Sequence, residues 1–208
     1  KQVISNEDID SVVDVLKSDF LTQGPVISKF EQKLCKTFHA SYALAVNSAT
    51  SALHIACLAL DVKKGDIVWT SPISFVASSN CAIYCGAEID FVDIDKNSFN
   101  MSVTSLEAKL EKAHKENKLP KVIIPVHLGG EPCNMKSIKK LSLKYGFSII
   151  EDASHAVGAF YGETKTGSCS YSDITVFSFH PVKIITTGEG GALLTNNKRL
   201  FNKLNLLR

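Results

Sequence analysis

The sequence predicts an α/β domain in which a mostly parallel sheet is covered by helices on both faces. Short apolar runs alternate with longer segments whose apolar residues recur at helical spacing. Runs of the first kind are typical of strands buried on both faces, and segments of the second kind are typical of amphipathic helices. Hydrophobic residues make up 45% of the 208 residues, and no tract is compositionally biased, so the chain can bury a sizeable core.

The expected helices begin at recognisable signals. Ser5 and Asp8 form a capping box ahead of apolar positions at helical spacing, and Phe30, Leu34 and Phe38 mark the apolar face of a second helix. Further helices are expected over residues 52–60, from about Phe75 to Gly86, over 105–115, over 135–145 and from about Asn197.

The expected strands are the short apolar runs between these helices. They cover residues 42–46, 67–70, 89–92, 122–126, 148–151, 174–179 and 192–195. Strands that alternate with helices in this way predict a sheet covered on both faces, although the pattern does not give the order of the strands.

Bulk properties argue against several classes of protein. The 23 Lys and Arg residues nearly balance the 21 Asp and Glu residues, and they are spread along the chain, so we expect no nucleic-acid partner. The apolar stretches are too short to span a bilayer, and the N-terminus lacks the apolar core of a signal peptide, so we expect no membrane partner. The six cysteines form no C-x-x-C pair, which predicts reduced thiols, no metal site and a cytoplasmic protein.

Polar clusters follow several of the expected strands, at residues 47–50, 71–75, 151–155 and 178–183. In open α/β sheets, ligands bind beyond the carboxyl ends of the strands. Each cluster alone could be an ordinary turn. Their coincidence at one edge of a sheet predicts a binding site there.

Two ionisable residues in these clusters each have two interpretations. Lys183 lies between Pro181 and apolar Ile184; it could be a solvated surface lysine, or an amine whose pKa is lowered by burial so that it forms a Schiff base. Asp152 could cap a helix, or it could pair with a buried cation such as a protonated pyridine nitrogen. Because Glu151 and Asp152 end one strand and point to opposite sides, only one of them faces the ligand edge.

Residues 48–51 open a helix directly after a strand. The free backbone N–H groups of such a helix start, with the hydroxyls of Ser48 and Thr50, suit a phosphate, although hydroxyl residues there are also ordinary caps. Residues 188–191 (Gly-Glu-Gly-Gly) lack the spacing of a nucleotide-binding glycine loop. We interpret them as a tight turn that lets the backbone approach the site.

Taken together and in order, these motifs resemble the sugar-nucleotide aminotransferases of the DegT/DnrJ/StrS type. The motifs are Asn-Ser-Ala-Thr-Ser-Ala-Leu at 47–53, Ser-Pro-Ile-Ser-Phe-Val-Ala at 71–77, Glu-Asp-Ala-Ser-His-Ala at 151–156, Ser-Phe-His-Pro-Val-Lys at 178–183 and Thr-Gly-Glu-Gly-Gly at 187–191, with Leu-Thr-Gln-Gly-Pro at 21–25 in the family's early turn near the substrate. The resemblance covers essentially the whole chain. It implies an aspartate-aminotransferase-like large domain of fold type I that binds pyridoxal 5′-phosphate (PLP).

The resemblance also implies roles for individual residues. Lys183 would carry the cofactor and move the proton between cofactor and substrate carbons, while Asp152 would keep the pyridine nitrogen protonated. Phe75 would stack on the ring, and His155 would meet the phenolic oxygen or the ring face. The phosphate would be bound by Ser48, Ala49, Thr50 and Ser178, and the substrate by Thr22 and His180.

Within the family, the motifs most resemble the group that aminates a UDP-linked 4-keto-6-deoxy sugar in pseudaminic acid biosynthesis, with L-glutamate as the amino donor. Aminotransferases of the perosamine, bacillosamine and viosamine type are alternatives, as is a non-catalytic PLP-binding regulatory relative. The family also implies a homodimer with shared active sites and a small C-terminal domain. We therefore expect residues 1–208 to be the PLP-binding large domain, the N-terminal part of a longer chain.

Overall fold

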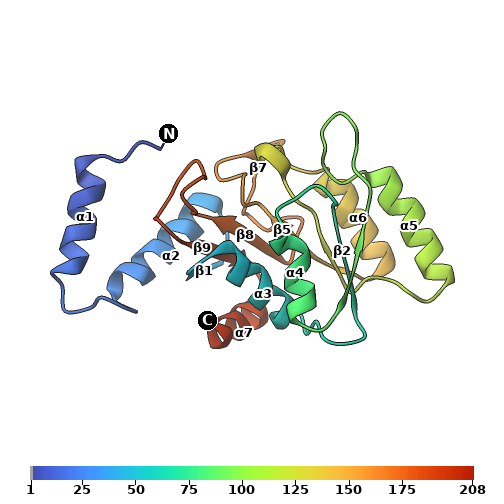
Figure 1. Ribbon diagram of the computed structural model, residues 1–208, viewed down its shortest axis with the longest axis horizontal. Coiled ribbons are helices and arrows are strands. Elements are labelled where there is room, and N and C mark those ends of the chain that lie inside the picture. The colour runs from blue at the N-terminus through green and yellow to red at the C-terminus, as the bar shows by residue number, and fades with distance from the viewer. Residues whose placement is uncertain (1) are drawn as a thin grey trace.

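A computed structural model describes residues 2–208 and contains a seven-stranded sheet between layers of helices (Figure 1). The helices are α1 (Asn6–Leu16), α2 (Pro25–Phe38), α3 (Ala49–Ala59), α4 (Ala77–Tyr84), α5 (Val103–Lys115), η1 (Leu128–Gly130, a 3₁₀ turn), α6 (Met135–Tyr145) and α7 (Lys198–Leu207). The strands are β1 (Tyr42–Val46), β2 (Ile67–Thr70), β3 (Glu88–Phe91), β4 (Val122–Ile124), β5 (Ser148–Asp152), β6 (Phe160–Tyr161), β7 (Thr164–Lys165), β8 (Ile174–Ser178) and β9 (Gly191–Thr195).

The strands of the large sheet lie in the order β1-β9-β8-β5-β4-β2-β3. Strand β9 is antiparallel to both of its neighbours, and all the other neighbouring pairs are parallel. The carboxyl ends of β2, β4, β5 and β8 therefore lie along one edge of the sheet. The predicted α/β class with a mostly parallel sheet is confirmed.

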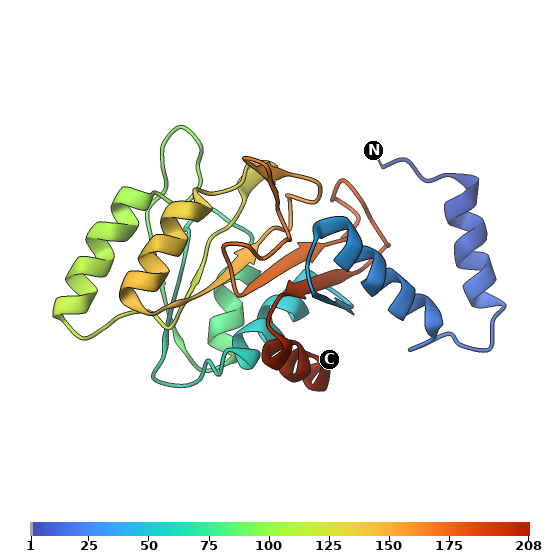
Figure 2. The ribbon, with the colours of Figure 1, turned by 180° about the vertical axis from the view of Figure 1, so that it is seen from behind.

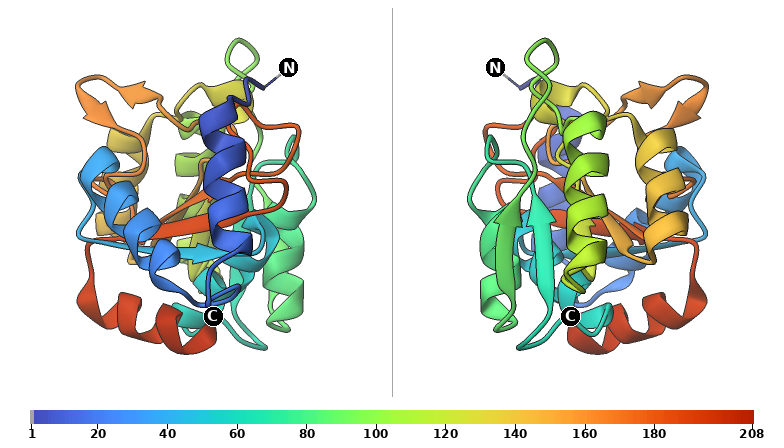
Figure 3. Two further views of the ribbon diagram at one scale, coloured as in Figure 1. Left: turned by 90° about the vertical axis from the view of Figure 1, so that its left-hand side faces the viewer. Right: turned by 90° about the vertical axis from the view of Figure 1, so that its right-hand side faces the viewer.

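Apolar layers on both faces join the sheet to its helices. Helices α3, α4 and α7 cover one face, where Leu53, Ile150 and Val176 are buried in one cluster. Helices α5 and α6 cover the other face around Ile149, and α2 continues that layer around Phe177 (Figure 2). The right-hand view of Figure 3 shows α5 and α6 side by side. Adjacent strand residues such as Ile149 and Ile150 face opposite layers, as the pleat of a strand requires.

Side-chain caps set several helix starts close to where the sequence predicts them. The capping box of Ser5 and Asp8 is present at α1. Ser48, Ser102 and Asn197 accept backbone N–H bonds at the starts of α3, α5 and α7. Each cap satisfies donors that the first helical turn leaves free.

A few boundaries differ from the prediction for local reasons. Pro125 has no N–H to donate, so β4 ends at Ile124, and the predicted strand over 122–126 continues only as a single bridge between Val126 and Asp152. The helix expected from about Phe75 begins at Ala77. The hairpin of β6 and β7 was not predicted, because strands of two residues carry no measurable periodicity.

Helix α1 stands apart from the body of the chain in Figures 1 and 2. None of its residues is buried, and Ile9, Val12 and Leu16 expose apolar side chains. The segment before it returns to the body, where the Gln2 amide donates hydrogen bonds to the carbonyl oxygens of Pro181 and Lys183. The N-terminal segment is therefore connected to the loop between β8 and β9.

The two outer strands of the sheet are protected in different ways. On β1, the N–H of Ala45 points away from β9 and donates to the Glu31 carboxylate at 2.9 Å, and Arg208 pairs with the same carboxylate. On β3, Glu88 and Asp90 place charges along an exposed strand. Both edges thus carry groups that discourage further strand pairing.

All six cysteines are free thiols. Within residues 2–208, no helix is long and apolar enough to cross a membrane, and no group of three or more potential metal ligands is present.

Candidate active site

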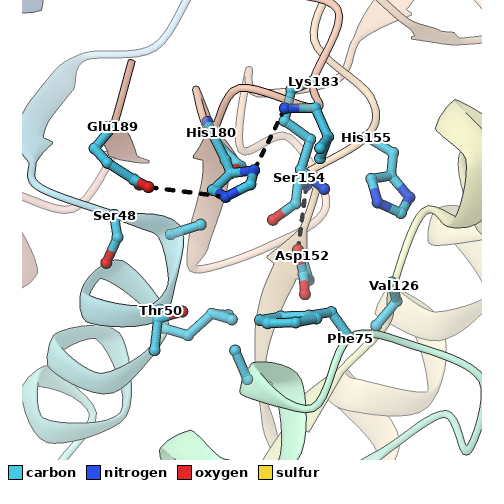
Figure 4. A pocket seen from close by; sticks show the side chains of 16 residues that line it. Ser48, Thr50, Phe75, Val126, Asp152, Ser154, His155, His180, Lys183 and Glu189 are labelled. Carbon is cyan, nitrogen blue, oxygen red and sulfur yellow. Dashed lines mark hydrogen bonds and ion pairs between the residues drawn. The ribbon is translucent and has the colours of Figure 1, made fainter. Parts of the chain in front are cut away.

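A cavity of about 240 Å³ lies at the carboxyl edge of the sheet. The ends of β5 and β8, the start of α3 and the loop between β8 and β9 contribute its walls, so segments more than 100 residues apart in sequence meet there. Figure 4 shows Lys183, Asp152, His155, Phe75, Thr50 and Ser48 around this one space. The polar clusters that the sequence places at strand ends do converge.

Asp152 is the last residue of β5, and its side chain lines the cavity although it is only 4% exposed. One carboxylate oxygen, Oδ2, accepts a hydrogen bond from the Ser78 hydroxyl at 2.6 Å, and Oδ1 accepts from the Ser154 N–H at 3.2 Å. Glu151, one residue earlier, lies on the opposite face of the sheet and pairs with His127. Of the two carboxylates, Asp152 is therefore the one that faces the cavity.

Lys183 lies on the loop between β8 and β9 and lines the same cavity. Its backbone N–H donates to the His180 carbonyl at 2.9 Å, which closes a tight turn around Pro181. Burial lowers the pKa of the Lys183 amine below its ordinary value, and the negative charge of Asp152 partly opposes this effect. A larger fraction of neutral, nucleophilic amine is the consequence.

His155 borders the cavity beside Asp152 and Lys183 (Figure 4). Its Nδ1 accepts a hydrogen bond from the N–H of Gly129 at 3.3 Å, so the proton of the neutral ring sits on Nε2. Burial, and then the positive charge of Lys183, lower the pKa of His155, against the opposing effect of Asp152. The ring is therefore neutral at neutral pH and can offer an Nε2–H donor.

Phe75 precedes α4 and presents its ring to the cavity while remaining 69% exposed. In the view of Figure 4 this ring lies below Asp152, on the side away from Lys183. An aromatic face this open is available to stack on a flat ligand.

The start of α3 forms the remaining wall, with Ser48, Ala49 and Thr50. The Ser48 hydroxyl caps the helix by accepting from the Ser51 N–H at 3.1 Å, which leaves the N–H groups of Ala49 and Thr50 free. Gly191 makes this arrangement possible, because a Cβ there would lie 2.5 Å from the carbonyl carbon of Ser48. Free N–H groups at a helix start bind anions well.

The other expected site residues are placed as follows. Ser178 ends β8 and lines the cavity, with its hydroxyl oxygen accepting from the His180 N–H at 3.4 Å. His180 also lines the cavity, and its Nε2 lies 3.8 Å from Glu189 at the exposed rim. Thr22 lies in an exposed turn between α1 and α2 and does not line the cavity within the described chain. A role for Thr22 in substrate binding stays a prediction.

Sequence reasoning did not identify Ser78 and Ser154 as partners of Asp152. Ser154 has a local signal, because an Asp commonly accepts from the N–H two residues ahead. Ser78 could have been suspected only from its place on the helix after Phe75, since its bond to Asp152 spans 74 positions in sequence.

The sequence pattern that defines the DegT/DnrJ/EryC1/StrS aminotransferase family matches residues 2–208 of the chain. The chain belongs to this family. The family resemblance inferred from the motifs is thereby confirmed.

Individual members of the family are similar to this chain over nearly its whole length. The UDP-4-amino-4,6-dideoxy-N-acetyl-β-L-altrosamine transaminase of Campylobacter jejuni (strain 81-176) is 44% identical over 207 residues, which cover 100% of this chain and 53% of the relative. The structure of Helicobacter pylori PseC, an aminotransferase involved in pseudaminic acid biosynthesis, matches with a TM-score of 0.89 and 36% identity, over 99% of this chain and 54% of PseC. The chain of 208 residues thus spans about half the length of each of these two relatives.

A further family member links the fold to the cofactor. The Streptococcus pneumoniae sugar aminotransferase Spr1654 has been solved in a PLP form and matches with a TM-score of 0.85 and 28% identity, over 99% of this chain and 56% of Spr1654. The cavity fits this cofactor chemically. A buried carboxylate suits a protonated ring nitrogen, a lysine whose pKa is lowered by burial suits an aldehyde, and the helix start suits a phosphate.

Proposed function

We propose that the chain is the cofactor-binding domain of an enzyme that moves an amino group from L-glutamate to the 4-keto carbon of a nucleotide-linked sugar, with PLP as the cofactor. One observation carries this proposal: Asp152, Lys183 and the open start of α3 border a single cavity. These three features match the ring nitrogen, the aldehyde and the phosphate of one small molecule.

In this proposal, PLP supplies a ring that withdraws electrons from the carbon next to the amino nitrogen. Asp152 holds the ring nitrogen in its protonated, electron-withdrawing form through a charge-assisted hydrogen bond. The Ser78 hydroxyl and the Ser154 N–H keep the carboxylate pointed at that nitrogen. Phe75 stacks on one face of the ring and fixes its plane.

Lys183 has two tasks in the proposed reaction. Its lowered pKa favours the neutral amine that bonds to the cofactor. When free, its Nζ atom would take the proton from the donor carbon, and in the second half of the cycle it would return a proton to the sugar carbon. The N–H groups of Ala49 and Thr50, with the hydroxyls of Ser48 and Ser178, bind the phosphate.

The substrate part of the proposal is narrower. We propose UDP-2-acetamido-2,6-dideoxy-β-L-arabino-hex-4-ulose, the keto sugar of the pseudaminic acid pathway. The identity of 44% to the Campylobacter jejuni transaminase and the similarity to PseC support this choice. His180 at the rim, and Thr22 if it is brought near, would contact the sugar nucleotide.

We also propose that residues 1–208 work as part of a longer cytoplasmic polypeptide that forms a homodimer with shared active sites. Val182 lines the cavity and is exposed, and exposed apolar side chains also lie within two positions of lining residues in the sequence, among them Ile73, Val76 and Ile185. A small C-terminal domain and a partner subunit would cover these side chains and exclude water from the reaction.

The test is to express residues 1–208 and the longer polypeptide side by side with PLP. The longer form should transfer the amino group of glutamate to the UDP-linked keto sugar in preference to the corresponding dTDP- and GDP-linked 4-keto sugars, and it should sediment as a dimer. The 208-residue chain alone should be inactive. A longer form that binds PLP yet transfers to none of the sugars would favour a non-catalytic relative, and an active monomeric fragment would contradict the shared-site proposal.

A further inference from the structure

A buried, hydrogen-bonded pair of ionisable side chains lies directly behind the cavity, on the opposite face of the sheet. The Nε2 of His127 is 3.1 Å from Oε2 of Glu151, and the two side chains are only 1% and 6% exposed. Nothing in the proposed chemistry uses this pair. Burying a charge is costly, so a pair in this position calls for a reason beyond packing.

His127 forms hydrogen bonds through four of its atoms, and two of these bonds reach the strand that carries the cavity carboxylate. Its backbone N–H donates to the carbonyl oxygen of Asp152 at 3.0 Å, and its Nε2–H donates to Glu151. Its Nδ1 accepts from the N–H of Cys133 at 3.2 Å, which leaves the proton on Nε2. The fourth atom is its carbonyl oxygen, which accepts from the Gly130 N–H at 3.2 Å. The orientation of the ring is therefore set on both sides.

The turn that follows His127 contacts His155. The Gly129 N–H donates to Nδ1 of His155, and Gly130 packs so closely that an added Cβ would lie 3.0 Å from the His155 carbonyl oxygen. Residues 127–130 therefore touch the side chain of Glu151, the backbone of Asp152 and the ring of His155.

We propose that His127 is a positioning residue that fixes the end of β5, and through it the direction of the Asp152 carboxylate and the placement of His155. The inference rests on the proposed function, because Asp152 must meet the cofactor nitrogen for its direction to matter. Rotation at the end of β5 would move the carboxylate away from the nitrogen it must contact. A displacement of about 1 Å at such a site costs about 10²-fold in rate.

The test uses the longer polypeptide loaded with PLP and compares four variants. His127→Phe combined with Glu151→Leu removes the pair without leaving a buried charge alone. Glu151→Gln keeps an acceptor for Nε2–H and serves as the conservative variant. The matched control is Ser142→Ala, which removes another buried hydrogen bond, from the Ser142 hydroxyl to the Phe147 carbonyl at 2.6 Å, on a helix that does not line the cavity. If the double variant does not fold, His127→Asn combined with Glu151→Gln replaces it, because neither amide leaves a buried charge alone.

We expect the double variant to bind PLP about tenfold more weakly and to shift the pH midpoint of the bound cofactor's absorbance. Its kcat should fall about 10²-fold, with the KM for the sugar nucleotide unchanged. Glu151→Gln should retain most of the wild-type PLP affinity and the wild-type absorbance profile. Ser142→Ala should lower the melting temperature but leave the PLP affinity and the absorbance profile unchanged.

Wild-type PLP affinity and an unchanged absorbance profile in the double variant would overturn the proposal. So would a Ser142→Ala variant with the same cofactor defects, because the effect would then reflect stability alone. A wild-type protein that binds no PLP would instead mean that the proposed function itself has failed.

Discussion

Replacing Gly191 with alanine tests whether the start of β9 and the start of α3 must touch for the phosphate end of the cavity to form. A Cβ at position 191 would lie 2.5 Å from the carbonyl carbon of Ser48, 2.6 Å from the nitrogen of Ala49 and 2.7 Å from the carbonyl oxygen of Ser48. All three atoms belong to the backbone, so no side chain can rotate to make room. One element must move by about 1 Å to restore ordinary van der Waals contact.

The magnitude follows from that displacement. Overpacking of this kind costs about 1–3 kcal/mol, and we expect a loss in the upper half of that range in the free energy of unfolding of Gly191→Ala. The same movement displaces the N–H groups of Ala49 and Thr50, and a weakened bond to a charged phosphate, about 1.5 kcal/mol, corresponds to about tenfold weaker PLP binding.

The assay is urea unfolding of the apoprotein together with PLP titration by absorbance. Gly162→Ala is the control, because Gly162 has a φ of 60° and open space around its Cβ position, in a turn remote from the cavity. It should lose about 1 kcal/mol from backbone strain and keep its PLP affinity. If Gly191→Ala retained both wild-type stability and wild-type affinity, the helix start and the strand would be free to separate and the reasoning would be wrong.

The remaining predictions concern the charged groups of the cavity. Lys183→Ala should bind PLP only non-covalently and lose turnover by several orders of magnitude; borohydride reduction and peptide mapping of the wild type check this, and a label on another lysine would contradict it. Asp152→Asn should keep the fold yet lower kcat by about 10²–10³-fold, measured as glutamate-dependent turnover, and near-normal turnover would exclude the role. Ser78→Ala should lower the free energy of unfolding by about 1.5 kcal/mol in a urea titration, because it removes the bond to a charged carboxylate, and an unchanged free energy would contradict that bond. The rate of covalent PLP attachment should rise with pH and level off below pH 10.5, because burial lowers the pKa of Lys183. In Asp152→Asn the rate should level off at a lower pH still, because the charge of Asp152 raises that pKa. Stopped-flow absorbance measures both profiles, and identical profiles would contradict the effect of Asp152.

Much of the fold could be predicted because its signals are local. Parallel strands buried on both faces are apolar throughout, so Ile67–Thr70 stands out in the sequence and matches the structure residue for residue. The outer strand Tyr42–Val46, which is antiparallel to β9, is also a continuous apolar run and is matched equally well. The strand order is not local. β5 pairs with β4 on one side and with β8 on the other, and nothing within the strand sequences records those choices.

The site residues, too, could be predicted only where their signal is local. Lys183 and Asp152 could be picked out because each sits at a strand end, beside residues that define a turn. The partners of Asp152 could not, because Ser78 and His127 reach it across 74 and 25 positions and leave no pattern in their own surroundings. The residues alone showed that only one of Glu151 and Asp152 could face the ligand edge, and the family resemblance pointed to Asp152. In the structure Asp152 lines the cavity, and Glu151 pairs with His127 on the other face.

The edges of the sheet have a consequence for how the protein behaves at high concentration. The N–H of Ala45, which would otherwise be open to a strand from another molecule, is already occupied by the Glu31 carboxylate. At the far edge, a strand approaching β3 would have to desolvate the charges of Glu88 and Asp90. Contact between copies through strand addition is therefore unfavourable at both ends of the sheet, which leaves exposed apolar side chains, such as those of α1, as the surfaces open to contact between copies.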